Sequence, residues 1–444
     1  MGRKSLTREL EVWINGKHVG EWRMPRRGDM EFQYDAAWIV AAEGRPLSLS
    51  MPYGLGETLI RGSAVENYFD NLLPDSDQIR RRIQSRYSTE STNAFDLLVA
   101  IGRDCAGAVQ LVPPGEDPGD IHKIQARPLS EREVEEALIH ATSSTPLRAM
   151  EDDDFRISIA GTQEKSAFLL HEKRWCKALG PTPTTHIFKL PLGLIGGKRR
   201  DWRYSLENEW LCSKIIDAYG VPIAKCEIEQ FGSQKVLIVE RFDRQLDASG
   251  RYWLRLVQED FCQALGLPSA KKYEEDGGPG ILDIAGILRG SVEREKDLAS
   301  LLQAQILFWM LAACDGHAKN FSIRILSQGR YHLTPLYDVL SYWPIAGEGV
   351  DKISPHKLKM AMAFRGKNKH SLLLNIQRRH MNETASRSGL GESAEPLIND
   401  ILRKTPSVVA AVQKHIPRGF PQEVVDSILN GVLASAKTME AVTV

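Results

Sequence analysis

A long apolar run that stops at one aspartate constrains this chain more than any other feature. The run, residues 304–314, reads AQILFWMLAAC, and the polar string DGHAKN follows at once, from Asp315 to Asn320. Such a run is long enough for a buried helix and too short to cross a bilayer. We therefore expect a helix in the core of a domain, with a loop of polar side chains presented at its end.

The composition limits the classes of protein to consider. A chain of 444 residues is too long for one compact core, so two or three domains are expected. Lys and Arg total 57, as do Asp and Glu, which argues against a nucleic-acid binder that uses its whole surface but allows a local basic patch. The six cysteines are dispersed without a C-x-x-C pair, which argues against a zinc site or a disulfide framework. With no apolar signal-peptide core at the N-terminus, we expect a cytoplasmic protein without a membrane anchor.

The first part of the chain has the pattern of a strand-rich module. Residues 9–22 alternate between apolar and polar side chains on either side of Asn15-Gly16, which predicts a β-hairpin. Residues 63–87 are predicted to be helical, with Ser63 as the N-cap. A shift to proline, glycine and acidic residues at 111–120 indicates a domain boundary.

The remainder is mixed at first and then mainly helical. A capping box, Ser130 with Glu133, predicts a short helix at 130–140. Residues 154–170 predict two strands on either side of the turn 160–165. Further elements are predicted as a strand at 184–191, a helix at 206–220 that ends at Gly220, a hairpin at 224–243 and a hairpin around Gly329 at 321–339. The fold class is therefore α+β, with an N-terminal module at 1–112, a small lobe at 150–258 and a large helical lobe at 259–444.

Three polar residues of the helical lobe are predicted to meet. Asp315 and Asn320 share one loop, and a hairpin that begins after them returns the chain to Asp338. Carboxylate and amide oxygens suit Mg²⁺, which usually shares its coordination with substrate phosphates. The order D-x-x-x-x-N, hairpin, D is that of the catalytic loop and metal aspartate of protein kinases. The alternative is that all three are ordinary helix-end and turn residues.

The small lobe contains candidates for the other parts of an ATP site. Lys189 lies on a short apolar strand and Glu209 on the helix that follows, the pair that a kinase uses to hold the α/β-phosphates. The alternative for Lys189 is a strand-end lysine that faces water. The turn around Gly161 could cradle phosphates although it contains a single glycine, but it could equally be a surface turn. The segment VERFD at 239–243 stands where the lobes join and where backbone groups could meet an adenine ring.

Eight stretches of the chain carry a specific resemblance. The chain resembles the HipA family of bacterial serine/threonine kinase toxins over nearly its whole length. The matching stretches, in order, are RPLSLSMP at 45–52, FDNLLPDS at 69–76, IGRDCAGAV at 101–109, DFRISIAGTQEKSA at 154–167, PTTHIFKLP at 183–191, VERFDR at 239–244, YEEDGGPGI at 273–281 and DGHAKNFS at 315–322.

The resemblance implies a two-lobed, protein-kinase-like fold and a role for each candidate residue. Asp315 looks like the catalytic base, Asn320 and Asp338 like the Mg²⁺ ligands, and Ser158 like a serine whose autophosphorylation displaces the phosphate loop and inactivates the enzyme. The residues implied to bind ATP are Ala160, Gly161, Thr162, Gln163, Glu164, Lys165, Lys189, Glu240, Arg241, Phe242, His317, Asn320, Tyr337 and Asp338.

The resemblance also implies partners. Members of the family phosphorylate a translation factor, typically an aminoacyl-tRNA synthetase, which favours dormancy and drug tolerance. A HipB-type helix-turn-helix antitoxin restrains them, and the pair represses its own operon on DNA. Possible DNA contacts lie in the basic runs 196–203 and 377–380, the latter comprising Gln377, Arg378, Arg379 and His380. Solvated surface is the alternative for both runs.

Two rival functions remain open from the sequence. One is a catalytically silent corepressor that supports an antitoxin on DNA, although the joint presence of Lys189, Asp315, Asn320 and Asp338 weighs against it. The other is a small-molecule kinase, which the N-terminal module disfavours. The stretch KKYEEDGGPG at 271–280 has the composition of a mobile, solvated loop, with substrate docking as the alternative.

Overall fold

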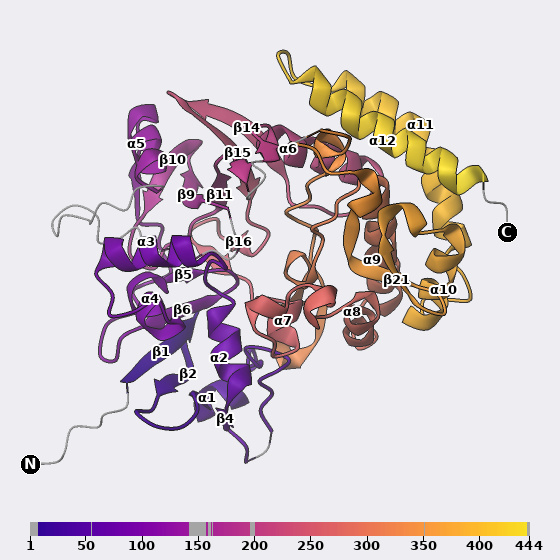
Figure 1. Cartoon of the computed structure of the whole chain (residues 1–444). Coiled ribbons are helices and arrows are strands. Elements are labelled where there is room, and N and C mark those ends of the chain that lie inside the picture. Colours follow the sequence, from indigo (N-terminus) through magenta and orange to yellow (C-terminus); the bar gives the residue numbers. More distant parts are fainter. Residues whose placement is uncertain are drawn as a thin grey trace, which may run out of the picture. The chain divides into compact units, whose positions relative to one another are not determined.

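The computed structural model describes residues 8–54, 56–141, 157–158, 161, 163–195, 200–349 and 351–441, without the side chains of residues 157 and 195. The chain divides into two compact units (Figure 1). The first comprises Met1–Lys189, Gln230–Ala270 and Ile323–Tyr331, and the second comprises Leu190–Glu229, Lys271–Ser322 and His332–Val444.

A five-stranded antiparallel sheet begins the first unit. The hairpin predicted around Asn15-Gly16 is confirmed: both residues have positive φ, 47° and 75°, as a tight hairpin turn between right-twisted strands requires. Trp22 from this sheet stacks on Phe69 with ring centroids 4.0 Å apart, which builds the core between the sheet and its helices. In sheet order the strands are β4 (Leu59–Arg61), β3 (Glu31–Tyr34), β2 (Lys17–Met24), β1 (Arg8–Ile14) and β6 (Val109–Val112).

The helices of this unit are short, and side chains cap several of them. The predicted helix at 63–87 is two helices, and Ser63 is not its N-cap: Gly62, with φ 97°, takes that position, while Ser76 caps the second helix by accepting from the Ile79 N–H. The capping box of Ser130 and Glu133 is confirmed by two reciprocal hydrogen bonds, of 2.8 and 3.3 Å. The helices are α1 (Ala36–Val40), α2 (Ser63–Asp70), α3 (Asp77–Tyr87), α4 (Ala94–Ile101), α5 (Glu131–Ala141) and α7 (Phe261–Ala264).

A six-stranded sheet forms the second layer of strands. The hairpin predicted at 224–243 is confirmed as β14 and β15, and β11 lies between β15 and β9. In order the strands are β14 (Cys226–Phe231), β15 (Gln234–Glu240), β11 (His186–Lys189), β9 (Lys165–His171), β10 (Arg174–Ala178) and β7 (Ala126–Pro128). β14 runs across the division between the two units.

Two strands lie on either side of the turn 160–165 as predicted, and each pairs with another strand. The first strand, β8 (Ile157–Ser158), pairs in parallel with β5 (Asp104–Cys105) rather than with β9. A side-chain hydrogen bond adds to this short pairing. The completely buried hydroxyl of Ser158 donates to the Leu72 carbonyl, 2.8 Å away, and so fixes the segment on the N-terminal module.

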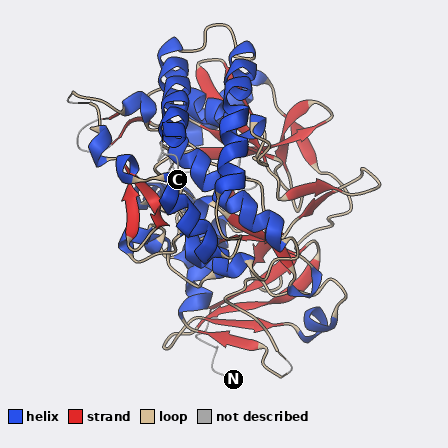
Figure 2. Ribbon diagram, turned by 90° about the vertical axis from the view of Figure 1, so that its right-hand side faces the viewer, coloured by secondary structure: helices blue, strands red, loops and turns tan. Residues whose placement is uncertain are grey.

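The second unit is built on the buried helix that the apolar run predicts. That helix, α9 (Arg294–Met310), is completely buried at Met310, and the helix α6 ends before Gly220, which has φ 85°, as expected. α11 and α12 lie side by side along their length (Figures 1 and 2). The other helices of this unit are α6 (Ser205–Ala218), α8 (Ile281–Leu288), α10 (Arg378–Ser388), α11 (Glu395–Lys414) and α12 (Gln422–Ala441).

Short elements complete the chain. The hairpin predicted around Gly329 is confirmed in the three-stranded sheet β18 (Gln258–Asp260), β19 (Ser322–Ile325) and β20 (Tyr331–Leu333). Two-stranded sheets form from β12 (Gly193–Ile195) with β13 (Arg200–Trp202), β16 (Arg244–Leu246) with β17 (Trp253–Arg255), and β21 (Lys359–Arg365) with β22 (Lys369–Leu372). The 3₁₀ helices are η1 (Ser269–Lys271), η2 (Glu274–Asp276), η3 (Ala318–Asn320), η4 (Ser327–Gly329), η5 (Trp343–Ile345), η6 (Pro355–Lys357) and η7 (Leu373–Asn375). Across the ranges that the structure describes, no helix is both long enough and apolar enough to cross a membrane.

A buried ionic network joins distant segments of the first unit. Asp104 accepts from Arg244 at 2.8 Å and from the Thr184 hydroxyl at 2.6 Å, and Arg241 binds Asp243 at 2.8 Å. Burial would raise the pKa of Asp104, but the charges of Arg244, Arg241 and Arg255 overcome that effect and hold the pKa below its usual range. The network is therefore stable only with its acidic members ionised.

We expect Asp104→Asn to lower the free energy of unfolding by about 3–5 kcal/mol, because it leaves buried guanidinium groups without their counter-charge. Denaturant unfolding measures this change. Asp117→Asn, at an exposed position, is the matched control and should leave the free energy nearly unchanged. Equal unfolding curves for the two variants would contradict the stabilising role of the network.

A second buried acid, Glu259, affects the pH dependence of the free energy of unfolding in the direction opposite to Asp104. Burial raises the pKa of Glu259 to about 8, although the Leu49 N–H donates to its Oε1 at 2.8 Å. The folded state therefore holds a proton that the unfolded state loses above about pH 4.3. The stabilisation is complete below that pH and is lost as the pH rises toward the folded value.

We expect the free energy of unfolding to fall between about pH 6 and about pH 8, on the order of 2 kcal/mol, through Glu259 alone. Glu259→Gln should remove this part of the decline, whereas Glu66→Gln, at an exposed position, should retain it. Denaturant unfolding at both pH values tests the prediction, and a Glu259→Gln protein with the parental pH dependence would refute it.

Candidate functional site

The polar loop begins where α9 ends in the second unit. The chain turns at Ala312, which has φ 47°, and the Cys314 carbonyl accepts from the Ala361 N–H at 3.0 Å. Gly316 is required in this turn because a Cβ there would lie 2.5 Å from the Phe308 ring. Residues 311–314 and 316–320 are buried, and Asp315 alone among them is exposed. The fold thus presents one carboxylate at the surface of an otherwise packed loop.

Asn320 and Asp338 meet as the sequence predicts. The Asn320 Nδ2 donates to Oδ2 of Asp338 at 3.3 Å, and its Oδ1 accepts from the His317 N–H at 3.1 Å. Asp338 has φ 62°, a left-handed conformation that is uncommon for a residue other than glycine and recurs at functional sites. The carboxylate and amide oxygens are of the kind that Mg²⁺ prefers. No group of three or more His, Cys, Asp and Glu side chains is arranged for a metal within the described ranges.

Tyr337 and His317 make defined contacts inside the second unit. The Tyr337 hydroxyl donates to the Lys319 carbonyl at 2.8 Å and lies 2.5 Å from the Ser322 hydroxyl, which ties the end of the hairpin to the polar loop. The ring of His317 lies edge-on to that of Tyr273, with centroids 5.0 Å apart. The ATP contacts of Tyr337 and His317 stay predictions.

Tyr273, which the sequence did not indicate as a site residue, reaches the polar loop. Its hydroxyl donates to Oδ1 of Asp315 at 2.6 Å. The prediction of a mobile, solvated loop at 271–280 is only partly right, because residues 275–277 are exposed but Glu274 is buried and binds Arg365 at 2.9 Å. A Cβ at Gly278 would lie 1.9 Å from the Lys271 carbonyl oxygen, so the backbone is closely packed at this turn.

The predicted phosphate loop of the first unit is bonded to the N-terminal module. The Asp75 N–H donates to the Gly161 carbonyl at 3.1 Å, and Pro74 and Gly161 form a parallel bridge. Gly161 has φ 111°, which a side chain would disfavour. Ala160 and Thr162 lie outside the described residues.

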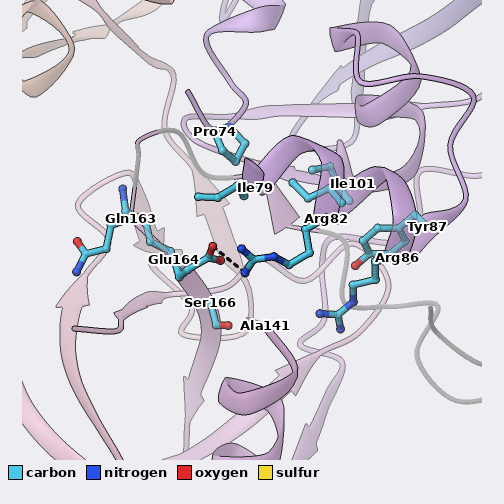
Figure 3. Close-up of a pocket in the computed structure, with 12 residues that line it drawn as sticks. Pro74, Ile79, Arg82, Arg86, Tyr87, Ile101, Ala141, Gln163, Glu164 and Ser166 are labelled. Atoms are coloured by element: carbon cyan, nitrogen blue, oxygen red, sulfur yellow. Dashed lines mark ion pairs between the residues drawn. The ribbon is translucent and has the colours of Figure 1, made fainter. Parts of the chain in front are cut away.

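An ion pair reinforces this support. Arg82 on α3 contacts Glu164 of the loop at 2.7 Å, beside a cavity of about 90 Å³ whose lining includes Ile79, Arg86 and Gln163 (Figure 3). Burial raises the pKa of Glu164, and the charge of Arg82 opposes that rise. Arg82 could not be recognised from the sequence, because its partner Glu164 is far away in the chain.

Two lysines face each other across neighbouring strands of the six-stranded sheet. Lys165 on β9 is directly opposite Lys189 on β11, and antiparallel partners project from the same face. Lys189 is 5% exposed, which excludes a strand-end lysine that faces water. Like charges placed opposite each other destabilise a sheet unless an anion compensates them. Glu209 is buried on α6 of the second unit, and its pairing with Lys189 stays a prediction.

The predicted hinge at 239–243 contributes Arg241 and Asp243 to the buried ionic network. The guanidinium of Arg241 is buried against Asp243 and Asp104, and its backbone N–H donates to the Thr185 carbonyl at 2.9 Å. Glu240 is exposed at the end of β15, and Phe242 is half-buried. The guanidinium of Arg241 is thus engaged away from any adenine, and adenine contacts by the backbone of Arg241 and by Glu240 and Phe242 stay predictions.

The basic run 377–380 is only partly at the surface. Arg378 binds Glu395, with Nε to Oε1 at 2.8 Å, and His380 is buried and stacked on His370 with centroids 3.6 Å apart. Burial lowers the pKa of His380 to about 4, so the ring is neutral at pH 7. Gln377 and Arg379 are exposed. DNA contact stays a prediction, and the geometry limits it mainly to those two residues; of the other run, 196–199 lie outside the described residues.

Comparisons with known proteins match two parts of the chain to family models. The model of the HipA-like C-terminal domain matches residues 157–409, and that of the HipA N-terminal domain matches residues 10–112. The putative kinase Y4mE of Sinorhizobium fredii is 35% identical over 338 residues, which cover 75% of this chain and 77% of that protein. The serine/threonine-protein kinase toxin HipA of Shewanella oneidensis is 28% identical over 435 residues, which cover 93% of this chain and 91% of that protein.

One solved structure confirms the fold class. A chain in the complex of HipA, HipB and operator DNA from Shewanella oneidensis aligns with a TM-score of 0.77 at 24% identity, covering 97% of each chain. The expected α+β fold is thus confirmed. From the domain matches and the relatives together, the chain belongs to the HipA family and is a protein kinase.

Proposed function

We propose that this kinase transfers the γ-phosphoryl group of Mg·ATP to a serine or threonine hydroxyl of a protein. The supporting observation is the arrangement within the second unit, where Asp315 is exposed, and Asn320 from the same loop contacts Asp338 in its left-handed conformation. A carboxylate beside paired oxygen ligands is what phosphoryl transfer needs, since catalysis there is mostly positioning and charge neutralisation.

In the proposed reaction Asp315 accepts the proton of the attacking hydroxyl, and the oxygens of Asn320 and Asp338 hold Mg²⁺. The bound ion would neutralise charge on the phosphate oxygens. The Asn320 Oδ1 fits this role because its backbone bond to His317 uses only one of the two lone pairs of an amide oxygen. Tyr337 supports the ligand Asp338 by fixing the adjoining turn.

The facing lysines support a phosphate site in the first unit. Lys165 and Lys189 concentrate positive charge on one face of the sheet, next to a loop whose carbonyl at Gly161 is already bonded to Asp75. An anion with several oxygens, such as the ATP phosphates, can accept hydrogen bonds from both ammonium groups at once. Glu240 and Phe242 would lie beside the adenine.

The burial of Ser158 supports a role in regulation. A phosphoserine carries about two negative charges and cannot stay in a completely buried position that donates to a carbonyl. Phosphorylation of Ser158 would therefore detach β8 from β5, and with it the support of the loop at Gly161. The modified chain would lose its phosphate loop and become inactive.

We propose that the kinase acts as a cytoplasmic toxin. The relative from Shewanella oneidensis is a kinase toxin, and a related chain is solved with HipB and operator DNA. By analogy, a HipB-like antitoxin would restrain this chain and repress the operon together with it. The acceptor would be a translation factor, in the first instance an aminoacyl-tRNA synthetase, and its phosphorylation would arrest growth and promote persistence.

We expect the purified protein to gain one phosphate at Ser158 on incubation with Mg·ATP. Asp315→Asn should reduce the rate of this gain roughly 100-fold or more, because it removes the proton acceptor, while ATP still binds. Intact-mass analysis with peptide mapping measures the gain, and calorimetry measures ATP binding. Direct transfer assays on candidate synthetases would then identify the acceptor.

Asp351→Asn, an exposed change in the same unit, serves as the control and should retain the parental rate. An Asp315→Asn protein that transfers phosphate at the parental rate would exclude the proposed base. A parent protein that binds ATP but modifies neither itself nor a synthetase would favour the silent corepressor.

A separate prediction tests the support of the phosphate loop. Arg82→Met should raise the dissociation constant of Mg·ATP roughly tenfold, because Glu164 loses its counter-charge and the loop loses an anchor. Its exposed neighbour provides the control, Arg81→Met, which should bind ATP like the parent. Calorimetric titration measures both constants, and equal constants would disprove the link between α3 and ATP.

A further inference from the structure

The Tyr273 hydroxyl donates to the carboxylate that we propose as the catalytic base. The distance from this hydroxyl to Oδ1 of Asp315 is 2.6 Å, in the range of a charge-assisted O–H···O⁻ bond. Tyr273 is only half-buried, so its hydroxyl could bind water instead of a protein group. Burial alone therefore does not force the hydroxyl onto Asp315, and the contact depends on how the backbone of Tyr273 is held.

The backbone on either side of Tyr273 is fixed to the second unit. On one side, the Lys272 carbonyl accepts from the Ala318 N–H of the polar loop at 3.3 Å. On the other side, buried Glu274 accepts from the Ala363 N–H at 2.7 Å and from Arg365 at 2.9 Å. The phenol is thus held between two anchors, one of them in the same loop as Asp315.

The turn after Tyr273 leaves little room for another arrangement. A Cβ at Gly280 would lie 2.6 Å from the Glu274 carboxylate, and one at Gly278 would lie 1.9 Å from the Lys271 carbonyl. The ring of Tyr273 also packs edge-on against His317. Ring and backbone therefore both restrict where the hydroxyl can lie.

We propose that Tyr273 is a positioning residue for phosphoryl transfer, an inference that rests on the proposed function. By holding Oδ1, the phenol fixes the rotation of the Asp315 carboxylate, so that an acceptor hydroxyl meets Oδ2 in one orientation. A phenol suits this task because it donates a hydrogen bond to the carboxylate without placing a charge beside it. The proton leaves the acceptor hydroxyl for Asp315, and Tyr273 neither gains nor loses one.

The test compares Tyr273→Phe with the parent at a series of ATP concentrations, following phosphate incorporation into the intact protein by mass. A slower reaction of the parent with ATPγS than with ATP establishes that transfer, and not the opening of Ser158, sets the rate. We expect the maximal rate of Tyr273→Phe to fall roughly 10- to 100-fold with the half-saturating ATP concentration unchanged. The matched control is Tyr252→Phe, a half-buried tyrosine of the first unit, which should behave like the parent.

Each other outcome overturns the inference. An unchanged maximal rate would show that the hydroxyl does not position Asp315, and a faster rate would show that it blocks the acceptor instead. A raised half-saturating ATP concentration at the parental maximal rate would make Tyr273 an ATP contact. A parent protein that transfers no phosphate would overturn the proposed function as well as this inference. An active parent whose maximal rate equals that of Tyr273→Phe would overturn this inference alone.

Discussion

The end of α9 is the constraint on which the second unit depends. The last carbonyls of a helix have no partner within the helix and must find one elsewhere. Here the residues that follow the metal candidate Asp338 in sequence supply the donors. The bonds are Trp343 Nε1 to the Met310 carbonyl at 2.9 Å, Ser341 Oγ to the Leu311 carbonyl at 2.6 Å and the Tyr342 N–H to the Ala312 carbonyl at 3.0 Å. Because the same segment satisfies the helix end and follows Asp338, the polar loop and the second carboxylate are fixed by one set of bonds.

A comparable dependence holds in the first unit, where the phosphate loop has a single described glycine. A glycine-rich loop obtains its shape from backbone freedom, whereas this loop is bonded to residues 72–82 of the N-terminal module through Ser158, Gly161 and Glu164. Those residues overlap the stretch FDNLLPDS at 69–76. That stretch and the loop therefore occur together because one supports the other through hydrogen bonds. The module is thereby part of the proposed nucleotide site and not an appended domain.

The sequence predicted correctly those elements whose conformation depends on residues near one another in the chain. Asn15-Gly16 determines its hairpin through its own positive φ angles, and the hairpin at 321–339 brings Asp338 to Asn320 because a hairpin returns the chain to its start. The features that were missed depend on partners far along the chain. Arg82 and Tyr273 look like ordinary surface residues until the fold supplies Glu164 and Asp315.

The same limit explains why some candidate residues have additional roles. Arg241 lies in the predicted adenine-binding hinge, and its buried guanidinium also needs counter-charges, one of which Asp104 provides from the N-terminal module. Arg378 was a candidate for DNA, but Glu395 lies one helix away and neutralises it. A zero net charge conceals such pairing, because the sequence reports how many charges there are and not which ones face each other.

Burial and exposure separate two steps of the proposed self-modification. Ser158 is completely buried, so its hydroxyl becomes an acceptor only after β8 leaves β5, at the cost of the bond to Leu72. Asp315 is exposed and its orientation is held by Tyr273, so the chemical step needs no comparable rearrangement within the second unit. The rate of inactivation would then depend both on how readily the N-terminal module releases the loop and on how well Asp315 is oriented, whereas turnover on an external acceptor would depend on the orientation of Asp315 alone. One chain could in this way remain active toward another protein while modifying itself slowly.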